Sequence, residues 1–146
     1  MPNADMTLTS LYQPRIREHA ARVRRDKRLD SPDVTATCRS PVCGSVVTLD
    51  LIILDGIPTR IGWKGRACTL GMASLGIVVR AGIGQTESQI SDVAQRLAEL
   101  LRGEDKDLPP AWEELSVFCA ARDFPTRFGS IELPFEAIAQ GFSKLK

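Results

Sequence analysis

The sequence of 146 residues lacks any apolar run near the roughly 20 residues needed to cross a bilayer, and its apolar runs, such as Leu51–Leu54, are short. No membrane association is therefore expected. The N-terminus has no basic stretch followed by an apolar one, so we expect no secretory signal and a cytoplasmic location. A formal net charge of +1 gives no overall attraction to nucleic acid, which disfavours nucleic-acid binding.

Histidine is also scarce, because His19 is the only one in the chain. This excludes most His-rich metal sites. There is no GxSxG motif, and no His–carboxylate pair in a context that suggests a hydrolase. A stand-alone catalyst is therefore not expected.

The chain has four cysteines but no CxxC motif, and they stand at Cys38, Cys43, Cys68 and Cys119. In a reducing cytosol structural disulfides are rare, so we expect free thiols. Each thiol is then either a small buried side chain or a reactive or metal-binding group.

The composition is that of an ordinary globular protein, with 43% apolar and 25% charged residues. The length favours one domain. We expect a flexible tail over residues 1–10 and a single domain over residues 11–146.

Three strands are predicted in the first half of the chain. Residues 34–39 and 46–54 alternate in the manner of strands, and residues 59–64 should return antiparallel after the hairpin signal Asp55-Gly56. In the second strand Val47, Leu49 and Leu51 share one face, with Thr48 and Asp50 on the other.

Helices are predicted around this meander. The expected ranges are about 8–25 (broken or begun near Pro14), 68–81 (with Gly71 and Gly76 allowing close packing), 86–103 (opened by a Thr86–Gln89 capping box and ended at Gly103), 111–121, and about 130–140 (capped by Ser130, with Pro134 in its first turn). The predicted class is α+β, a three-stranded antiparallel β-meander followed by helices packed on one face.

Charge is concentrated near the N-terminus, where residues 11–30 hold seven basic and three acidic side chains, a net charge of +4. Such a segment is typically a solvated surface. It is also a candidate surface for phosphate or an acidic protein partner, with Arg22, Arg24 and Arg25 at its centre.

Two cysteines stand at positions typical of a site. Cys43 lies in the loop between the first two strands, and Cys68 opens a helix after the third strand. The start of strand two and the end of strand three are neighbours in an antiparallel meander, so we expect the two thiols at one end of the sheet. The helix N-terminus and Arg66 would favour the Cys68 thiolate, although Cys68 could equally be a buried cap. Gly44 and Gly65 allow close approach of the backbone.

The other two cysteines are expected to be packing residues. Cys38 lies within a strand, and Cys119 is placed on the apolar side of a helix beside Phe118. His19 is expected at the surface, with a third metal ligand as the less favoured alternative.

Four short segments, taken in order, resemble the NifU/IscU/SufU-type iron–sulfur cluster assembly scaffolds: Leu11-Tyr12, Ser40-Pro41-Val42-Cys43-Gly44, Gly65-Arg66-Ala67-Cys68, and Phe124-Pro125-Thr126-Arg127 through Ser130. The resemblance runs from about residue 8 to 140 and implies that family's α+β fold.

The resemblance also implies a ligand set of three cysteines and an aspartate that binds zinc or a nascent iron–sulfur cluster. Cys43 and Cys68 match the first two cysteines, Gly44 matches the loop glycine, and Arg127 matches an arginine of the sulfur-relay members. Ser45 stands where the family has the aspartate, and Ser130 stands where it has the third cysteine. Serine hydroxyls are poor ligands beside thiolate and carboxylate.

The resemblance implies a cysteine desulfurase and recipient iron–sulfur proteins as partners, and a homo-oligomer is one way to complete a shared cluster. The expected function is an assembly scaffold that binds iron or a cluster weakly, or shares it, through Cys43 and Cys68. The alternatives are a ligand-poor binding module that docks a desulfurase and a carrier of persulfide sulfur.

Overall fold

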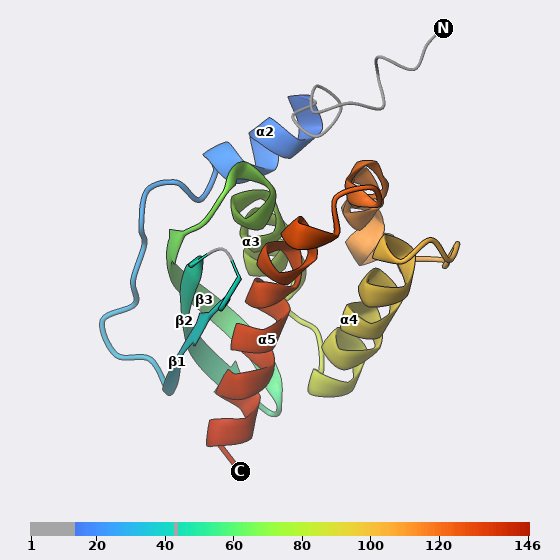
Figure 1. Cartoon of the computed structure of the whole chain (residues 1–146). Coiled ribbons are helices and arrows are strands. Elements are labelled where there is room, and N and C mark those ends of the chain that lie inside the picture. Colours follow the sequence, from blue (N-terminus) through green and yellow to red (C-terminus); the bar gives the residue numbers. More distant parts are fainter. Residues whose placement is uncertain (1–13, 43) are drawn as a thin grey trace, which may run out of the picture.

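A three-stranded antiparallel sheet forms the first layer of the protein (Figure 1). The computed structural model describes residues 14–42 and 44–146. Strands β1 (Val34–Arg39), β2 (Val46–Leu54) and β3 (Ile57–Arg66) are ordered β1-β2-β3, which confirms the predicted meander. Asp55 and Gly56, with φ of 54° and 78°, form the tight turn between β2 and β3.

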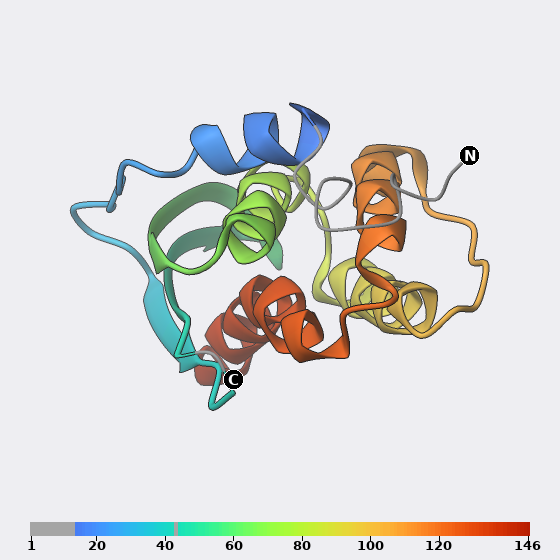
Figure 2. The same cartoon turned by 45° about the horizontal axis from the view of Figure 1, so that its top comes forward.

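Helices form the second layer: α2 (Pro14–Ala21), α3 (Thr69–Ala81), α4 (Glu87–Leu101), the 3₁₀ helices η2 (Pro110–Ala121) and η3 (Pro125–Arg127), and α5 (Phe128–Lys144). Helices α3 and α5 lie on one face of the sheet, and α4 packs against α5 (Figure 1). Helix α2 packs across α3 (Figure 2). The α+β class with helices on one face is confirmed.

The core lies between these layers. Val47, Leu49 and Leu51 of β2 are buried on the face that meets the helices, as their alternation predicts. A second part of the core, around Trp112 and Phe118, joins η2 to α3 and α4. Within the described residues, no helix combines the length and the apolar character that crossing a membrane requires.

The opposite face of the sheet is crossed by the basic segment 22–30. Its backbone pairs with β3 where Lys27 and Trp63 exchange hydrogen bonds of 2.9 and 2.8 Å. It passes so close over Gly62 that a Cβ there would lie 2.7 Å from the Lys27 carbonyl oxygen and 2.8 Å from the Leu29 nitrogen. The residue without a side chain therefore allows the segment to lie flat on the sheet.

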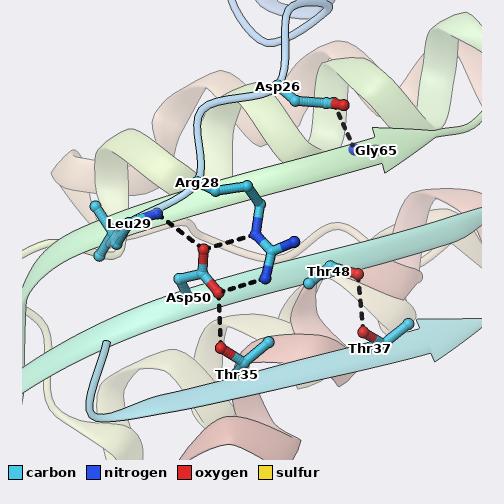
Figure 3. A network of polar contacts seen from close by, with 8 residues as sticks. All are labelled: Asp26, Arg28, Leu29, Thr35, Thr37, Thr48, Asp50 and Gly65. Atoms are coloured by element: carbon cyan, nitrogen blue, oxygen red, sulfur yellow. Dashed lines mark hydrogen bonds and ion pairs between the residues drawn. The ribbon is translucent and has the colours of Figure 1, made fainter. Parts of the chain in front are cut away.

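The carboxylate of Asp50 in β2 holds the basic segment against this face of the sheet by hydrogen bonds (Figure 3). Its fully buried carboxylate accepts hydrogen bonds of 2.8 and 3.0 Å from the Arg28 guanidinium, 3.0 Å from the Leu29 backbone N–H, and 2.7 Å from the Thr35 hydroxyl. Burial alone raises the pKa of Asp50, but these hydrogen bonds outweigh it and the net pKa is lowered. Asp50 thus ties β2, β1 and the basic segment together.

Several boundaries differ from the predictions. Helix α2 begins at Pro14 but ends at Ala21 rather than near residue 25, because the Trp63 indole N–H donates to the Val23 and Arg25 carbonyls and holds that backbone outside a helix. The predicted tail, Leu11-Tyr12 and any helix before Pro14 lie outside the described residues.

The last helix is also longer than predicted. It begins at Phe128 directly after η3, so Ser130 is inside its first turn and caps nothing, and Pro134 lies in the helix interior rather than in the first turn. Residues 110–121 form a 3₁₀ helix. The Thr86–Gln89 capping box is confirmed, with the Gln89 N–H donating to Thr86 Oγ1 at 3.1 Å and the Thr86 N–H donating to Gln89 Oε1 at 2.8 Å.

Candidate functional site

Three side chains from distant parts of the chain meet at one end of the sheet. The Ser45 and Ser130 hydroxyl oxygens lie 3.1 Å apart, and the Cys68 thiol lies 3.5 Å from Ser130 Oγ. Ser45 directly precedes β2, Cys68 is the residue before α3, and Ser130 is in the first turn of α5. These are three of the four positions that the family resemblance assigns to metal ligands.

The register of the sheet explains why Ser45 and Cys68 lie at the same end of the molecule. Val46, which begins β2, pairs with Arg66, which ends β3, so Ser45 and Cys68 leave the sheet at the same end. This placement agrees with the prediction from the meander for the second strand's start and the third strand's end.

Gly71 of α3 explains how Ser130 of α5 reaches the same place. A Cβ at this position of α3 would overlap Ser130 Oγ and would lie 3.2 Å from the Ser130 carbonyl oxygen. The absence of that carbon lets α5 approach α3 at the turn that carries Ser130.

The loop before β2 is held by its own backbone. Gly44, with φ of 72°, donates its N–H to the Ser40 carbonyl at 3.0 Å, and the Ser40 N–H donates to the Ser45 carbonyl at 2.8 Å. The positive φ is a conformation that glycine adopts readily. Cys43 belongs to this loop and lies outside the described residues.

The donor set of this cluster is poor for a resident metal ion. Ser130 is fully buried and Ser45 is 4% exposed, and both carry neutral hydroxyls. Cys68 is half-buried and brings a thiol. Across the described part of the chain, no group of three or more histidine, cysteine, aspartate or glutamate side chains is placed to hold a metal ion. The described residues therefore do not fit a closed four-donor zinc site.

In this structure the Arg66 guanidinium pairs with Asp26 rather than with Cys68. Its guanidinium forms hydrogen bonds of 3.0 and 3.1 Å to the Asp26 carboxylate on the basic segment, which lower the pKa of that carboxyl. The cation at the start of α3 is instead Arg24, whose guanidinium donates to Thr69 Oγ1 at 3.3 Å. Sequence spacing could not show this contact, because the residues are far apart in the chain.

Of the remaining arginines of the predicted set, three are exposed and one is half-buried. Arg22, Arg24 and Arg25 are all exposed after α2, as a partner surface requires. Arg127 is half-buried immediately before α5, three residues from Ser130.

The other cysteines and the histidine are placed as follows. Cys38 lies in β1 and is half-buried, as predicted; burial, followed by the charge of Glu136, raises the pKa of its thiol. The prediction of a buried Cys119 is wrong, because the 3₁₀ repeat of η2 turns Phe118 inward and Cys119 to solvent. The surface prediction for His19 is also wrong.

His19 is only 6% exposed because α2 packs tightly on α3, where a Cβ on Gly76 would overlap the His19 carbonyl oxygen. With a rise of about 1.5 Å per residue, Gly76 lies roughly 12 Å along α3 from Cys68. The structure therefore does not bring His19 to the cluster as a third ligand.

Comparison with known proteins places this chain among named relatives. It is 22% identical over 137 residues to the iron-sulfur cluster assembly scaffold protein IscU of Streptococcus pyogenes, covering 94% of this chain and 86% of the relative. It is 20% identical over 137 residues to the zinc-dependent sulfurtransferase SufU of Bacillus subtilis, covering 94% and 92%.

A solved structure is also similar to this chain. The N-terminal part of a nitrogen-fixing NifU-like protein from Brucella abortus superposes with a TM-score of 0.88 at 30% identity, covering 94% of this chain and 96% of that one. No family model matches the sequence.

Proposed function

The chain belongs to the NifU/IscU/SufU family of iron–sulfur cluster assembly scaffolds, and we propose that within this family it carries iron or an iron–sulfur cluster as cargo through Cys68 and Cys43. The observation that supports this is the meeting of Cys68, Ser45 and Ser130. Ser45 and Cys68 each lie within hydrogen-bond distance of Ser130, although tens of residues separate the three in the sequence.

The same cluster implies that the cargo is held weakly or shared. A cluster of the [2Fe–2S] type is commonly held by four thiolates, and this chain offers two at the matched positions. The remaining ligands would come from a second copy of the chain, from a small thiol or from a recipient protein. Weak holding suits a scaffold, because the cluster must leave it.

A cysteine desulfurase and recipient iron–sulfur proteins are the partners this function requires, as sulfur source and as destination. The exposed arginines Arg22, Arg24 and Arg25 support docking of an acidic partner surface. Arg24 also contacts the first residue of α3, so a partner bound there would lie beside Cys68.

Anaerobic reconstitution with ferrous iron and sulfide tests the proposal. We expect visible charge-transfer absorption in the wild-type protein and its loss in the Cys43→Ala/Cys68→Ala double variant. Cys119→Ala is the matched control, because Cys119 is exposed and lies on η2. No absorption in the wild type, or an unchanged spectrum in the double variant, would contradict cluster binding.

The persulfide carrier is the alternative function, and one relative is named a sulfurtransferase. In that reaction the thiolate of Cys43 or Cys68 attacks the terminal sulfur of the desulfurase persulfide and releases the desulfurase thiolate. A sulfur adduct on either cysteine, detected by mass spectrometry after incubation with desulfurase and free cysteine, together with failure of reconstitution, would favour this alternative.

A further inference from the structure

A cleft of about 600 Å³ lies between α2, the C-terminal half of α3 and η2, away from the cysteine cluster. Arg80 lines it near the end of α3, and at about 1.5 Å of rise per residue it lies roughly 18 Å along the helix from Cys68. Part of the wall is apolar and is formed by Ile77, Ala81, Ile83 and Ala111. The rest of the wall is formed by polar and charged side chains.

One carboxylate of the cleft is already engaged. Glu114 forms an ion pair with Arg15 and accepts a hydrogen bond from His19 Nε2 at 2.8 Å. These contacts, with the Arg15 hydrogen bond the largest, lower the pKa of Glu114 to about 2. Arg22 donates to His19 Nδ1, so the neutral imidazole carries its proton on Nε2 and donates it to Glu114.

Among the described residues, two guanidinium groups of the cleft form no ion pair with a carboxylate. The Arg22 guanidinium donates to the His19 imidazole, and the Arg80 guanidinium has no hydrogen bond or ion pair within the described part of the chain. Burial, followed by repulsion from Arg80, lowers the pKa of Arg22. Glu18 also faces the cleft, so its charged lining holds three guanidinium groups and two carboxylates, an excess of one positive charge.

We propose that this cleft binds a small phosphomonoester, with the phosphate at Arg22 and Arg80 and an apolar body against Ile77 and Ala111. Two guanidinium groups that repel each other are stabilised by an oxyanion that bridges them. A phosphomonoester carries close to two negative charges at neutral pH, which matches two arginines better than a monoanionic carboxylate does. The apolar wall gives the body of the ligand a surface to pack against. This proposal does not rest on the iron–sulfur function, although Arg22 also belongs to the arginines proposed to dock a partner.

Isothermal titration of the full chain with phenyl phosphate tests the site, with inorganic phosphate and benzoate as comparison ligands. We expect saturable binding of phenyl phosphate at one site per chain. Inorganic phosphate should bind more weakly because it lacks the apolar body, and benzoate more weakly because it carries one charge. Absence of saturable binding at millimolar phenyl phosphate, or benzoate binding as tightly, would overturn the proposal.

Variants locate the site. Arg80→Gln should weaken phenyl phosphate binding about tenfold or more, because the charge-assisted contacts between this guanidinium and the phosphate are lost. Arg22→Gln should have a similar effect. Arg17→Gln, an exposed arginine of α2 that does not line the cleft, is the control and should leave affinity unchanged. An equal loss in Arg17→Gln, or no loss in Arg80→Gln, would show that binding follows surface charge alone and would refute the site.

Discussion

Ser45 Oγ lies 3.1 Å from Ser130 Oγ in a buried pair that joins the loop before β2 to the first turn of α5. Both serines occupy positions where the family resemblance places a metal ligand. A neutral hydroxyl pair can be buried and hydrogen-bonded without a cation, whereas a buried carboxylate beside a thiolate needs one. The pair therefore explains how this fold remains intact with a weaker donor set.

Restoring the ligands should restore metal affinity. In the Ser45→Asp/Ser130→Cys double variant, Cys43, Cys68 and the two new side chains supply four strong donors, so we expect about one zinc ion per chain. Metal analysis after dialysis against zinc measures the zinc bound per chain. The wild-type protein should retain far less. A double variant that is folded but binds no more zinc than wild type would show that these four positions do not converge.

Loss of the Asp50 charge should destabilise the protein. Asp50→Asn keeps the shape but removes the charge that faces the Arg28 guanidinium, and we expect a loss of about 1–3 kcal/mol in the free energy of unfolding. Urea denaturation measures it. The control is Asp92→Asn, which breaks an exposed pair with Arg96 and should cost about 0.5 kcal/mol or less. Equal effects of the two variants would contradict the anchoring role of Asp50.

Glu114 should contribute to stability in a pH-dependent way. Its pKa in the fold is about 2, below its usual value of 4.5, so the contribution is present above pH 4.5 and is lost as the pH falls toward 2. Because its side chain is 39% exposed, solvent screening limits the contribution to about 1 kcal/mol or less. Urea denaturation between pH 5 and 2 should show a shallower pH dependence for Glu114→Gln, and identical slopes would refute this.

The free thiols should react at different rates. Cys119 is exposed, whereas Cys38 is half-buried and burial raises the pKa of its thiol. Iodoacetamide should therefore label Cys119 before Cys38 at neutral pH, and Cys38 should catch up as the pH rises. Peptide mass spectrometry over time gives both rates. Faster labelling of Cys38 at neutral pH would contradict the structure.

Local sequence patterns were sufficient for the meander, α3 and α4, because alternation, the Asp55-Gly56 turn and the Thr86–Gln89 capping box are short-range signals. They were insufficient where a distant segment decides the outcome. The Asp50–Arg28 contact depends on the path of the basic segment over Gly62. The exposure of Cys119 depends on η2 being a 3₁₀ helix, whose repeat differs from that of an α-helix.

The site was predictable in part for the same reason. The register of β2 and β3 brings Ser45 and Cys68 to one end of the sheet, and a meander is enough to expect that. Arrival of Ser130 depends on α5 packing against Gly71 of α3, and the family resemblance rather than any local pattern indicated that position. The Arg66–Asp26 and Arg24–Thr69 contacts could not be read from spacing.

The most direct test of the central claim is iron and labile-sulfide analysis of anaerobically purified protein, wild type against Cys43→Ser and Cys68→Ser. If the chain carries a cluster through these thiols, the wild type should contain iron and sulfide in equal amounts at a fraction of one cluster per chain, and each variant should lose both. Wild-type protein free of iron and sulfide, or variants that retain the wild-type content, would contradict the account.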